Sequence, residues 1–356
     1  MAYLRHAVGM QLPCAKKQKS AAAKIKQLKE KNLKKTVFID GQHGTTGLKI
    51  HERLKNRDDI QIIEIPVEKK KNKVEKKKYL NEADIVFLCL PDDAARESVS
   101  MINNDSVCVI DASTAHRISE NWVYGLPELN KKQRELIISS NRICVPGCHA
   151  TGFILLLYPL ISEGIVDKGY PISSYSISGF SGGGKSMITD YQINNLGEDL
   201  KNPRPYSLKL NHKHIPEMQK IPGLLFPPIF SPTVANFYNG EIITVPLFSR
   251  CLCKAATAKE ISLLYQKYYS DEQFINVMPY PSDKFLKDGF LTITDCNNTN
   301  RLEIFVFGDD DRVLTTARFD NLGKGSSGAA IQNMNLKIGV EENKGLNVIA
   351  AAGKMA

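Results

Sequence analysis

The feature that most constrains the fold is a short apolar run followed at once by a glycine-rich turn and a helical pattern. Residues 36–40 predict a strand, the turn spans residues 41–47, and apolar residues at helical spacing come directly afterwards. Glycines let the backbone approach a diphosphate, and a helix N-terminus supplies N–H donors to it. The spacing is G-x-x-G-x-x-G rather than G-x-G-x-x-G, which leaves an ordinary tight turn as the alternative.

The same order of elements continues along the chain. Further strands are predicted at residues 60–65, 84–90 and 106–110, with a helix between the last two. Strands that alternate with helices are typical of a parallel, doubly wound sheet. Because ligands bind at the carboxyl ends of such strands, segments 91–93 and 111–117 are candidate parts of a site.

Cys148 lies where a predicted strand, residues 142–144, gives way to an apolar segment, residues 153–161, that predicts a helix. A helix N-terminus carries free N–H groups and partial positive charge, which favour thiolate over thiol. Since the thiolate is the nucleophile, we hypothesise that Cys148 attacks an acyl group. A buried cysteine at the end of a strand is the alternative interpretation.

The pattern changes after this helix. Alternating apolar and polar residues with few helices predict a second domain whose sheet is mixed and largely antiparallel. The last helical segment, residues 323–335, is expected to return to the first domain. The strands predicted for the second domain are 172–178, 234–237, 242–247, 291–294, 302–307 and 313–318, with one helix at about 259–268.

Two loops of the second half carry residue types suited to chemistry. Residues 178–185 could wrap a phosphate or a cofactor with backbone N–H groups and one lysine, or could form a flexible linker. His212, His214 and Glu217 lie within six residues, and an imidazole with a nearby carboxylate suits acid–base work. A two-histidine metal site competes with this idea, but no third ligand is evident, so we predict no metal.

A basic segment follows the second predicted strand. Glu64, near the end of that strand, could hold the ribose hydroxyls of NAD. Lysines then crowd residues 69–78, which suits the 2′-phosphate of NADP. We therefore expect NADP rather than NAD, although a solvated loop accounts for most of these lysines.

The net charge of +9 belongs to one end of the chain. Residues 1–35 hold nine Lys, one Arg and one Glu, and the remainder holds 37 basic and 37 acidic side chains. This balance does not favour nucleic-acid binding, and no apolar run reaches the roughly 18 residues of a membrane helix. Eight cysteines without a C-x-x-C pair indicate a reducing compartment. We expect a cytoplasmic protein, with organellar targeting by the basic extension left open.

Eight strings together resemble the N-acetyl-gamma-glutamyl-phosphate reductases of the shorter type. They run in the family's order from residue 38 to residue 336: FIDGQHGTTGL, LCLPDDAA, DASTAHRI, YGLPEL, VPGCHATG, SGFSGGGKS, HKHIPEM and NLGKGSSGAAIQNMNL. The resemblance implies an NADP-binding Rossmann domain (36–147, completed by 321–356) and a catalytic and dimerisation domain (148–320), after a basic extension (1–35). This fold is shared with aspartate-semialdehyde and glyceraldehyde-phosphate dehydrogenases.

The family's activity, carried over, is the NADPH-dependent reduction of N-acetyl-gamma-glutamyl phosphate to N-acetylglutamate semialdehyde and phosphate, in arginine biosynthesis. The reaction proceeds through a cysteine thioester, and a homodimer or homotetramer is implied. The alternatives are a reductase of aspartyl phosphate or of an N-substituted aminoadipyl phosphate, or a non-catalytic NADP-binding redox regulator.

The resemblance also assigns roles to single residues. It makes Cys148 the nucleophile and His214 the acid–base, with Glu217 orienting His214. His149 departs from the family, which often has an aromatic residue after the nucleophile, and whether His149 or His212 shares the acid–base role stays open. The cofactor-binding residues that it implies are Gly41, Gly44, Thr45, Thr46, Gly47, Lys70, Pro91, Ser113, Gly182, Gly183 and Asn321, and the substrate-binding residues are Arg117, Ser181 and His212.

Overall fold

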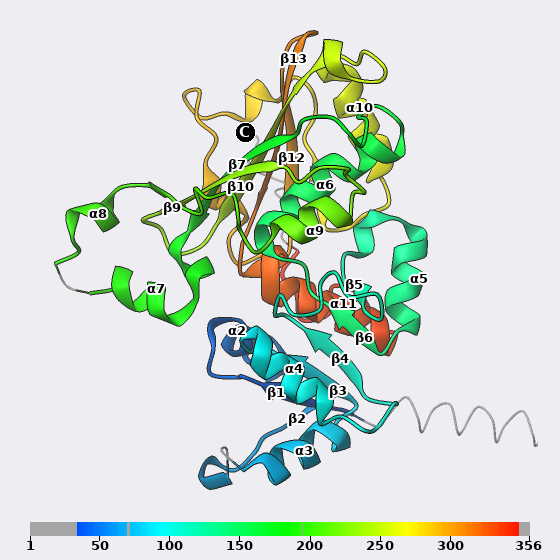
Figure 1. Ribbon diagram of the computed structural model, residues 1–356, viewed down its shortest axis with the longest axis vertical. Coiled ribbons are helices and arrows are strands. Elements are labelled where there is room, and N and C mark those ends of the chain that lie inside the picture. Colours follow the sequence, from blue (N-terminus) through cyan, green and yellow to red (C-terminus); the bar gives the residue numbers. More distant parts are fainter. Residues whose placement is uncertain (1–33, 70–71, 194, 349–356) are drawn as a thin grey trace, which may run out of the picture.

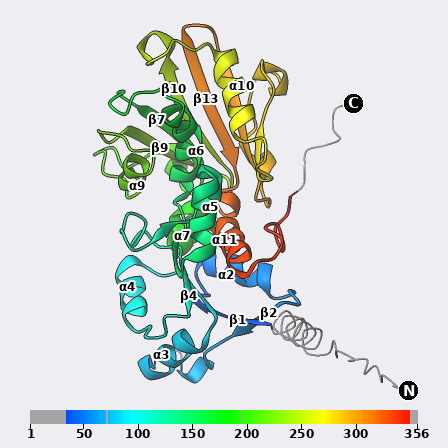
Figure 2. The same ribbon diagram turned by 90° about the vertical axis from the view of Figure 1, so that its right-hand side faces the viewer.

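The computed structural model describes residues 34–69, 72–193 and 195–348, which form two lobes joined along one side (Figures 1 and 2). The lower lobe in Figure 1 holds the first strands of the chain, and the upper lobe holds the later ones. Helix α11 (Gly328–Ile338) lies between the lobes in both views. Lys70, nearly all of the basic extension and residues 349–356 lie outside the described residues.

The first domain is a parallel sheet covered by helices, made of β1 (Lys35–Asp40), α2 (Thr45–Leu54), β2 (Ile60–Ile63), α3 (Lys73–Glu82), β3 (Ile85–Leu88), α4 (Asp92–Ser100), β4 (Cys108–Asp111), β5 (Val123–Tyr124), α5 (Lys131–Ser139), β6 (Arg142–Cys144) and α11. The six strands run in the order β2-β1-β3-β4-β6-β5. In β3, Ile85 and Phe87 face α2, α5 and α11, whereas Val86 and Leu88 face α3 and α4. Both faces of the strand are therefore buried, which is why its sequence is continuously apolar.

The second domain is built on a mixed sheet of seven strands, made with its helices from α6 (Cys148–Ser162), β7 (Ser173–Gly179), α7 (Gly184–Tyr191), α8 (Glu198–Lys201), β8 (Arg204–Pro205), α9 (Ile215–Lys220), β9 (Ile229–Ala235), β10 (Glu241–Phe248), α10 (Ala258–Tyr268), β11 (Ile275–Val277), β12 (Leu302–Gly308) and β13 (Arg312–Phe319). The strand order is β11-β12-β13-β10-β7-β9-β8. Side chains alternate between a face packed on α6 and α10 and an opposite face that is partly exposed. The predicted fold class, a Rossmann-type parallel sheet plus a mixed-sheet domain, is confirmed.

Helix α6 fixes where Cys148 lies. Eleven of its fifteen residues are buried, because β10 and β13 cover one side and α9 and α10 approach from others. Gly152 permits the closest approach, since a Cβ there would lie 2.5 Å from Cγ1 of Ile243 on β10. A helix held this tightly by the core gives its first residue little freedom to move.

The chain returns to the first domain through a π-helix, Gly323–Ser327, that leads directly into α11. Ala329, Ala330, Ile331 and Met334 join the apolar core of the first domain. The fully buried Lys324 donates to Glu128 at 2.6 Å, so an ion pair also ties the π-helix to that domain. Single-turn π segments are frequent at functional sites.

Three sequence-based expectations about local structure are wrong. Residues 291–294 were predicted as a strand but overlap a short 3₁₀ helix, Ile293–Cys296. The strand expected at 234–237 begins earlier, as β9, and ends at Ala235. The basic segment expected as a loop is mostly helix α3, which Asn72 caps by accepting from the N–H groups of Val74 and Glu75.

None of the helices among the described residues combines the length and hydropathy that a bilayer-spanning segment needs.

Candidate active site

Cys148 is the first residue of α6 and lines a cavity of about 280 Å³ between the two domains. Gly147 precedes it as the N-cap and offers no side chain to the first N–H groups of the helix, which leaves them able to bind an oxyanion. Burial is the main cause that raises the pKa of the Cys148 thiol well above its usual range, followed by the negative charge of Glu241. Burial and Glu241 thus oppose the preference for thiolate that is expected at a helix terminus, and the nucleophilic role of Cys148 stays a prediction.

Two histidines lie beside the thiol, and a third packs against both of them. Sγ of Cys148 and a nitrogen from each of His149 and His214 all lie within 4.8 Å of one another. The ring of His212 is 5.2 Å from that of His149 and 4.7 Å from that of His214. Burial, then the charge of Arg117, holds the pKa of His214 well below its usual range, and burial, then His149, lowers that of His212 to about 3. His212 and His214 are thus neutral at physiological pH.

Glu217 does not orient His214, contrary to the expectation from the sequence. Its Oε1 accepts from Nη1 of Arg117 at 2.7 Å, and its Oε2 accepts from the hydroxyl of Tyr124 at 2.6 Å and the N–H of Gly147 at 3.1 Å. Nδ1 of His214 is buried without a hydrogen-bond partner among the described residues. The reason is electrostatic, because a buried carboxylate gains more from a buried guanidinium than from a neutral imidazole.

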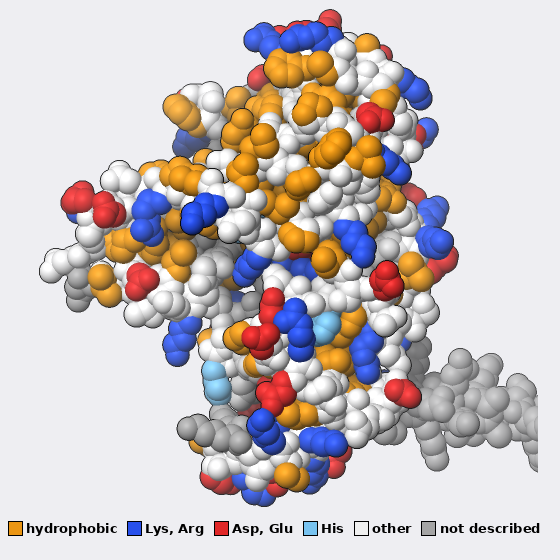
Figure 3. Space-filling model, viewed as in Figure 1, with side chains coloured by type: hydrophobic (Ala, Val, Ile, Leu, Met, Phe, Trp, Pro, Cys, Tyr) orange, Lys and Arg blue, Asp and Glu red, His pale blue; other side chains and the backbone are white. Residues whose placement is uncertain are grey.

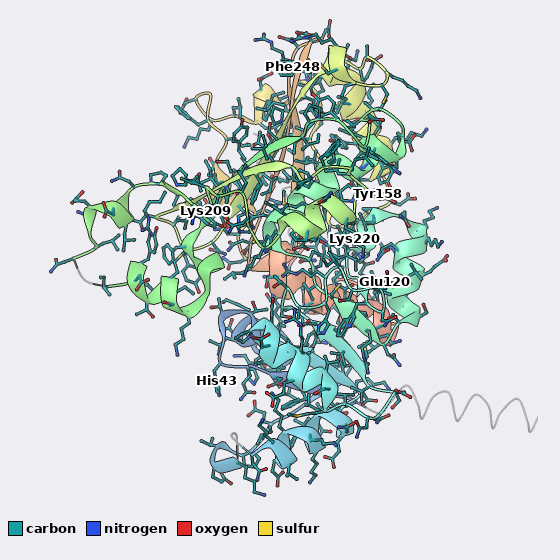
Figure 4. The ribbon with its side chains drawn as sticks, viewed as in Figure 1. His43, Glu120, Tyr158, Lys209, Lys220 and Phe248 are labelled. Atoms are coloured by element: carbon teal, nitrogen blue, oxygen red, sulfur yellow. The ribbon has the colours of Figure 1, made fainter. Side chains whose placement is uncertain are left out.

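Arg117 is held by backbone as well as by Glu217. Its Nε donates to the carbonyl of Val145 at 3.0 Å, and its Nη2 donates to the carbonyl of Ala112 at 3.3 Å. Lys220, labelled on α9 in Figure 4, donates to the carbonyl of Ile118 at 2.7 Å. The loop that follows β4 is thus tied to α9, and it presents a fixed cation to the cavity.

Gly147 is the point on which these groups converge. A Cβ at this position would lie 2.5 Å from Nε2 of His214 and 2.6 Å from Nη1 of Arg117. His214 and Arg117 therefore pack directly against the backbone that precedes Cys148. The position admits no side chain while both groups keep their places.

The glycine turn after β1 has the shape that a diphosphate requires. Gly41 has φ +87°, and a Cβ there would lie 2.3 Å from the carbonyl oxygen of Cys89. Gly44 is the N-cap of α2 and makes no side-chain cap, so the first N–H groups of that helix are available to an anion. Thr45 and Thr46 line the same cavity as Cys148, and these features fit a dinucleotide lying across the interface between the domains.

The loops on the far side of the cavity meet at Asn321. Its amide nitrogen donates to the hydroxyl of Ser181 at 3.0 Å, and its amide oxygen accepts from the N–H of Gly240 at 2.9 Å. Gly182 and Gly183 line the cavity beside Ser181. The structure thus brings these four predicted residues together, although it assigns no role to any of them.

Other predicted residues lie apart from the cavity lining. Ser113 is buried and donates its hydroxyl to Asp111 at 2.8 Å, which gives it a structural partner. Pro91 caps α4 at the carboxyl end of β3. Lys69 pairs with Glu75 at 2.9 Å, and Lys70 lies outside the described residues.

The fold brings several further residues to the surroundings of Cys148 that local sequence patterns do not single out. Glu241 is fully buried and contacts Nδ1 of His149. Nε2 of His149 is hydrogen-bonded to the hydroxyl of Tyr206 at 2.9 Å. A Cβ at Gly325, in the π-helix, would lie 2.8 Å from Cβ of Cys148. Only Glu241 carried a signal, since it is an acid in the inward-facing row of β10 that otherwise holds aliphatic residues.

A thiol and two imidazoles also suit zinc, so the cluster of Cys148, His149 and His214 bears on the prediction of no metal. Both ring nitrogens of His149 already face protein partners, Glu241 and Tyr206. That leaves two side chains of the cluster free to ligate, fewer than a structural or catalytic zinc takes. The absence of a metal stays a prediction that elemental analysis of the purified protein tests.

Two family models match the chain. The one for the semialdehyde dehydrogenase NAD binding domain covers residues 22–137, and the one for the semialdehyde dehydrogenase dimerisation domain covers residues 148–321. A nicotinamide-binding domain and a domain of the dimerising type therefore account for most of the chain.

Relatives of similar length share nearly half of the sequence. N-acetyl-gamma-glutamyl-phosphate reductase 2 of a Nostoc species is 44% identical over 320 residues, covering 88% of this chain and 99% of the relative. N-acetyl-gamma-glutamyl-phosphate reductase of Mesorhizobium japonicum is 44% identical over 312 residues, covering 86% and 100%. Aspartate semialdehyde dehydrogenase II of Vibrio cholerae has the same fold, with a TM-score of 0.64 at 15% identity over 86% of this chain and 98% of that one.

Proposed function

The chain belongs to the N-acetyl-gamma-glutamyl-phosphate reductases, within the semialdehyde dehydrogenase family, and we propose that it reduces N-acetyl-gamma-glutamyl phosphate to N-acetylglutamate semialdehyde in arginine biosynthesis. The observation that carries this proposal is that Cys148 opens α6 in the cavity that also reaches the glycine turn. A nucleophile beside a dinucleotide site suits reduction of an activated acyl group. An unactivated carboxylate is a poor hydride acceptor.

The chemistry starts with attack by Sγ of Cys148 on the acyl carbon. The S–C bond forms, the C–O bond to phosphate breaks, and phosphate leaves, so that one difficult step becomes two easier ones. Uncapped N–H groups at the start of α6 stabilise the negative charge on the carbonyl oxygen. Arg117, fixed at the edge of the cavity, attracts the anionic substrate.

A bound nicotinamide cofactor supplies the hydride. Residues of the turn over 41–47 and the N-terminus of α2 would hold its diphosphate. Neutral His214 faces the reacting centre, where its ring can hydrogen-bond to the carbonyl oxygen while that oxygen carries negative charge. Collapse of the resulting adduct breaks the C–S bond and returns the electron pair to Sγ.

We assign NADPH as the cofactor. Glu64 is the acid that could hold the ribose hydroxyls of NAD. Its carboxylate contacts Nε2 of His51 at 3.2 Å, and this contact competes with binding of the ribose. Lysines follow within a few residues of that strand end. The comparison of kcat/KM for NADPH and NADH tests the assignment, and equal values would contradict it.

The function is tested in the reverse direction with N-acetylglutamate semialdehyde, NADP and phosphate. The proposal expects NADPH absorbance to rise at a steady rate only when phosphate is present. Aspartate semialdehyde in place of the N-acetylated aldehyde tests the alternative substrate. Protein that binds NADPH but turns over neither aldehyde would support the redox-regulator alternative.

The outward face of the second sheet is proposed to form a homodimer. Tyr175 and Ile177 of β7, Phe248 of β10 and Leu314 of β13 are 38–53% exposed on that face, and β13, β10 and β7 are neighbouring strands. Figure 3 shows hydrophobic side chains gathered over the upper lobe, to which these strands belong. An apolar patch of this kind marks an association surface.

The dimer is tested with Ile177→Glu, which places a charge within the patch. Light scattering after size exclusion should give a dimer or a tetramer for the unchanged protein and a smaller species for the variant. Leu263→Glu, at a 53% exposed position on α10, is the matched control and should leave the assembly intact. An unchanged assembly for Ile177→Glu would contradict the interface. Location in the cytoplasm stays a prediction.

A further inference from the structure

The π-helix, Gly323–Ser327, touches both halves of the site with adjacent residues. A Cβ at Gly325 would lie 2.8 Å from Cβ of Cys148, so the backbone of the π-helix packs directly on the start of α6. The hydroxyl of Ser326 lies 3.1 Å from that of Thr46, in the first turn of α2. A shift of this one segment would therefore disturb the nucleophile and the end of the glycine turn together.

The residue before Gly325 belongs to a buried ion pair. Lys324 and Glu128 are 0% and 1% exposed, and Nζ donates to Oε1 of the carboxylate at 2.6 Å. The same Nζ donates to Oε1 of Gln332 on α11 at 2.7 Å, and Nε2 of Gln332 donates to Oε1 of Glu128 at 2.7 Å. These three hydrogen bonds join the π-helix and α11 to the 3₁₀ helix Pro127–Leu129 of the first domain.

Stability does not explain why a charged pair occupies this position. Burial raises the pKa of Glu128, but Lys324 outweighs that effect and holds the pKa below its usual value, so the carboxylate is ionised. Removing two charges from water is unfavourable, and an apolar pair of similar volume is often as stable or more stable. The ion pair supplies direction instead, because each hydrogen bond restricts both a distance and an angle.

The two domains hold the π-helix from different sides. A Cβ at Gly323 would lie 2.1 Å from the carbonyl oxygen of Thr299, and a Cβ at Gly328 would lie 2.2 Å from Oδ1 of Asn300. The ends of the segment are therefore pressed against the residues that precede β12 of the second domain. The side chain of Lys324 joins the part next to Gly325 to the first domain.

We propose that Lys324 is a positioning residue for the reaction, because its ion pair with Glu128 holds the π-helix so that Gly325 fixes the conformation of Cys148. This inference rests on the proposed function for its turnover assay but not for its geometry. Neither Lys324 nor Glu128 lines the cavity, so an effect of the pair on turnover must pass through the π-helix. A displacement near 1 Å at a reacting centre lowers the rate by about 10²-fold.

The first test removes both charges in one protein. Lys324→Met together with Glu128→Gln leaves no unpaired charge in the interior, so the melting temperature should lie close to that of the unchanged protein. N-acetylglutamate semialdehyde and NADP without phosphate give a single turnover, seen as a burst of NADPH. The burst should stay about 10²-fold slower in this double variant. A role in stability alone would restore the burst together with the melting temperature.

The second test measures alkylation of Cys148 by iodoacetamide, without substrate. A π-helix that no longer packs firmly on Cys148 exposes the thiol, so alkylation should be faster in the double variant while the burst is slower. Cys144, which is fully buried on β6, should stay unmodified, whereas partial unfolding would expose both thiols. Fragment spectra of peptide 143–168 separate the two cysteines.

Glu303→Gln together with Arg318→Met is the matched control. These residues form an ion pair of similar burial, 2% and 6% exposed. Arg318 lies on the face of the second sheet opposite α6, because its neighbour Phe319 packs toward that helix. The control should keep the burst and the alkylation rate of the unchanged protein. An equal loss in the control, or a burst within twofold of the unchanged protein for Lys324→Met with Glu128→Gln, would overturn the proposal.

Gly325→Ala decides the matter if the double variant does not fold. The added Cβ would lie 2.8 Å from Cβ of Cys148, so it moves the nucleophile without altering the ion pair, and the burst should fall by a similar factor. A burst within twofold of the unchanged protein would contradict the role of this contact. If the unchanged protein gives no burst and no phosphate-dependent NADPH, the proposed substrate is wrong. The alkylation test then still decides whether the ion pair positions Cys148.

Discussion

Gly147→Ala is the substitution whose effect the structure specifies most closely. The backbone of Gly147, with φ −69° and ψ 149°, suits alanine as well as glycine. The added Cβ, however, would lie 2.5 Å from Nε2 of His214 and 2.6 Å from Nη1 of Arg117. The collision is therefore with two side chains of the site, and the backbone of residue 147 can stay as it is.

The size of the effect follows from these distances. Ordinary contact begins at 3.4 Å, so His214 must retreat by about 0.9 Å and Arg117 by about 0.8 Å. A displacement near 1 Å at a reacting centre lowers the rate by about 10²-fold. Overpacking lowers the free energy of unfolding by about 1–3 kcal/mol. Alanine restricts the unfolded chain more than glycine does, and this offsets about 0.4–1 kcal/mol of that loss. We therefore expect kcat to fall by about 10²-fold with only a modest loss of stability.

The assay is the phosphate-dependent formation of NADPH from N-acetylglutamate semialdehyde, with the melting temperature and NADPH affinity measured beside it. NADPH affinity should be unchanged, since the atoms nearest to the added Cβ belong to His214 and Arg117 rather than to the turn over 41–47. Gly197→Ala is the control, because a Cβ at Gly197 meets nothing within 4 Å and its φ of −60° suits alanine. It should keep full activity.

A Gly147→Ala variant with kcat within about threefold of the unchanged protein would refute the reasoning, because His214 and Arg117 would then have moved without consequence. A variant that unfolds at room temperature would refute it differently. The added Cβ would then have disrupted the packing of the whole domain rather than the positions of His214 and Arg117 alone.

Three further predictions concern other parts of the molecule. Cys148→Ser should lower turnover by at least about 10³-fold and leave NADPH fluorescence titrations unchanged. Burial raises the pKa of Asp59, but Arg57 and Lys344 outweigh it and lower that pKa to about 2. The stabilisation from Asp59 is present above pH 4 and lost as the pH falls toward 2. Because solvent screens this partly exposed carboxylate, in urea titrations Asp59→Asn should lose about 1 kcal/mol at pH 7 and little at pH 2. Lys324→Met leaves the carboxylate of Glu128 buried without its cation. It should lower the free energy of unfolding by about 3–5 kcal/mol, and Glu128→Gln in the same chain should recover most of that loss.

Local sequence was enough to place Cys148, the proposed nucleophile. Cys148 follows a strand by four residues and begins a helix, and both elements are short-range features that periodicity reveals. The glycine turn over 41–47 was equally accessible, because a tight strand-to-helix turn depends on residues within seven positions. Sequence patterns also gave the parallel sheet of the first domain, since its strands are buried on both faces.

Local sequence patterns did not reveal which buried charged side chains pair with one another. Glu217 was paired with His214, three residues away, but the fold brings Arg117 to it from 100 residues away. Sequence offers no measure of which cation reaches a buried carboxylate. The lysine-rich segment after β2 was expected to be a solvated loop, but most of its described residues form helix α3.

The amino-acid sequence determined which candidate reactive groups the chain offers and on what kind of scaffold, because those properties depend on nearby residues and on the order of motifs. The tertiary structure alone decided the protonation chemistry of the site. Burial and then Glu241 raise the pKa of Cys148, and burial and then Arg117 lower the pKa of His214. Desolvation and nearby charges shift a pKa only over a few ångströms. The residues that lie this close together in the site are separated by about a hundred positions in the chain.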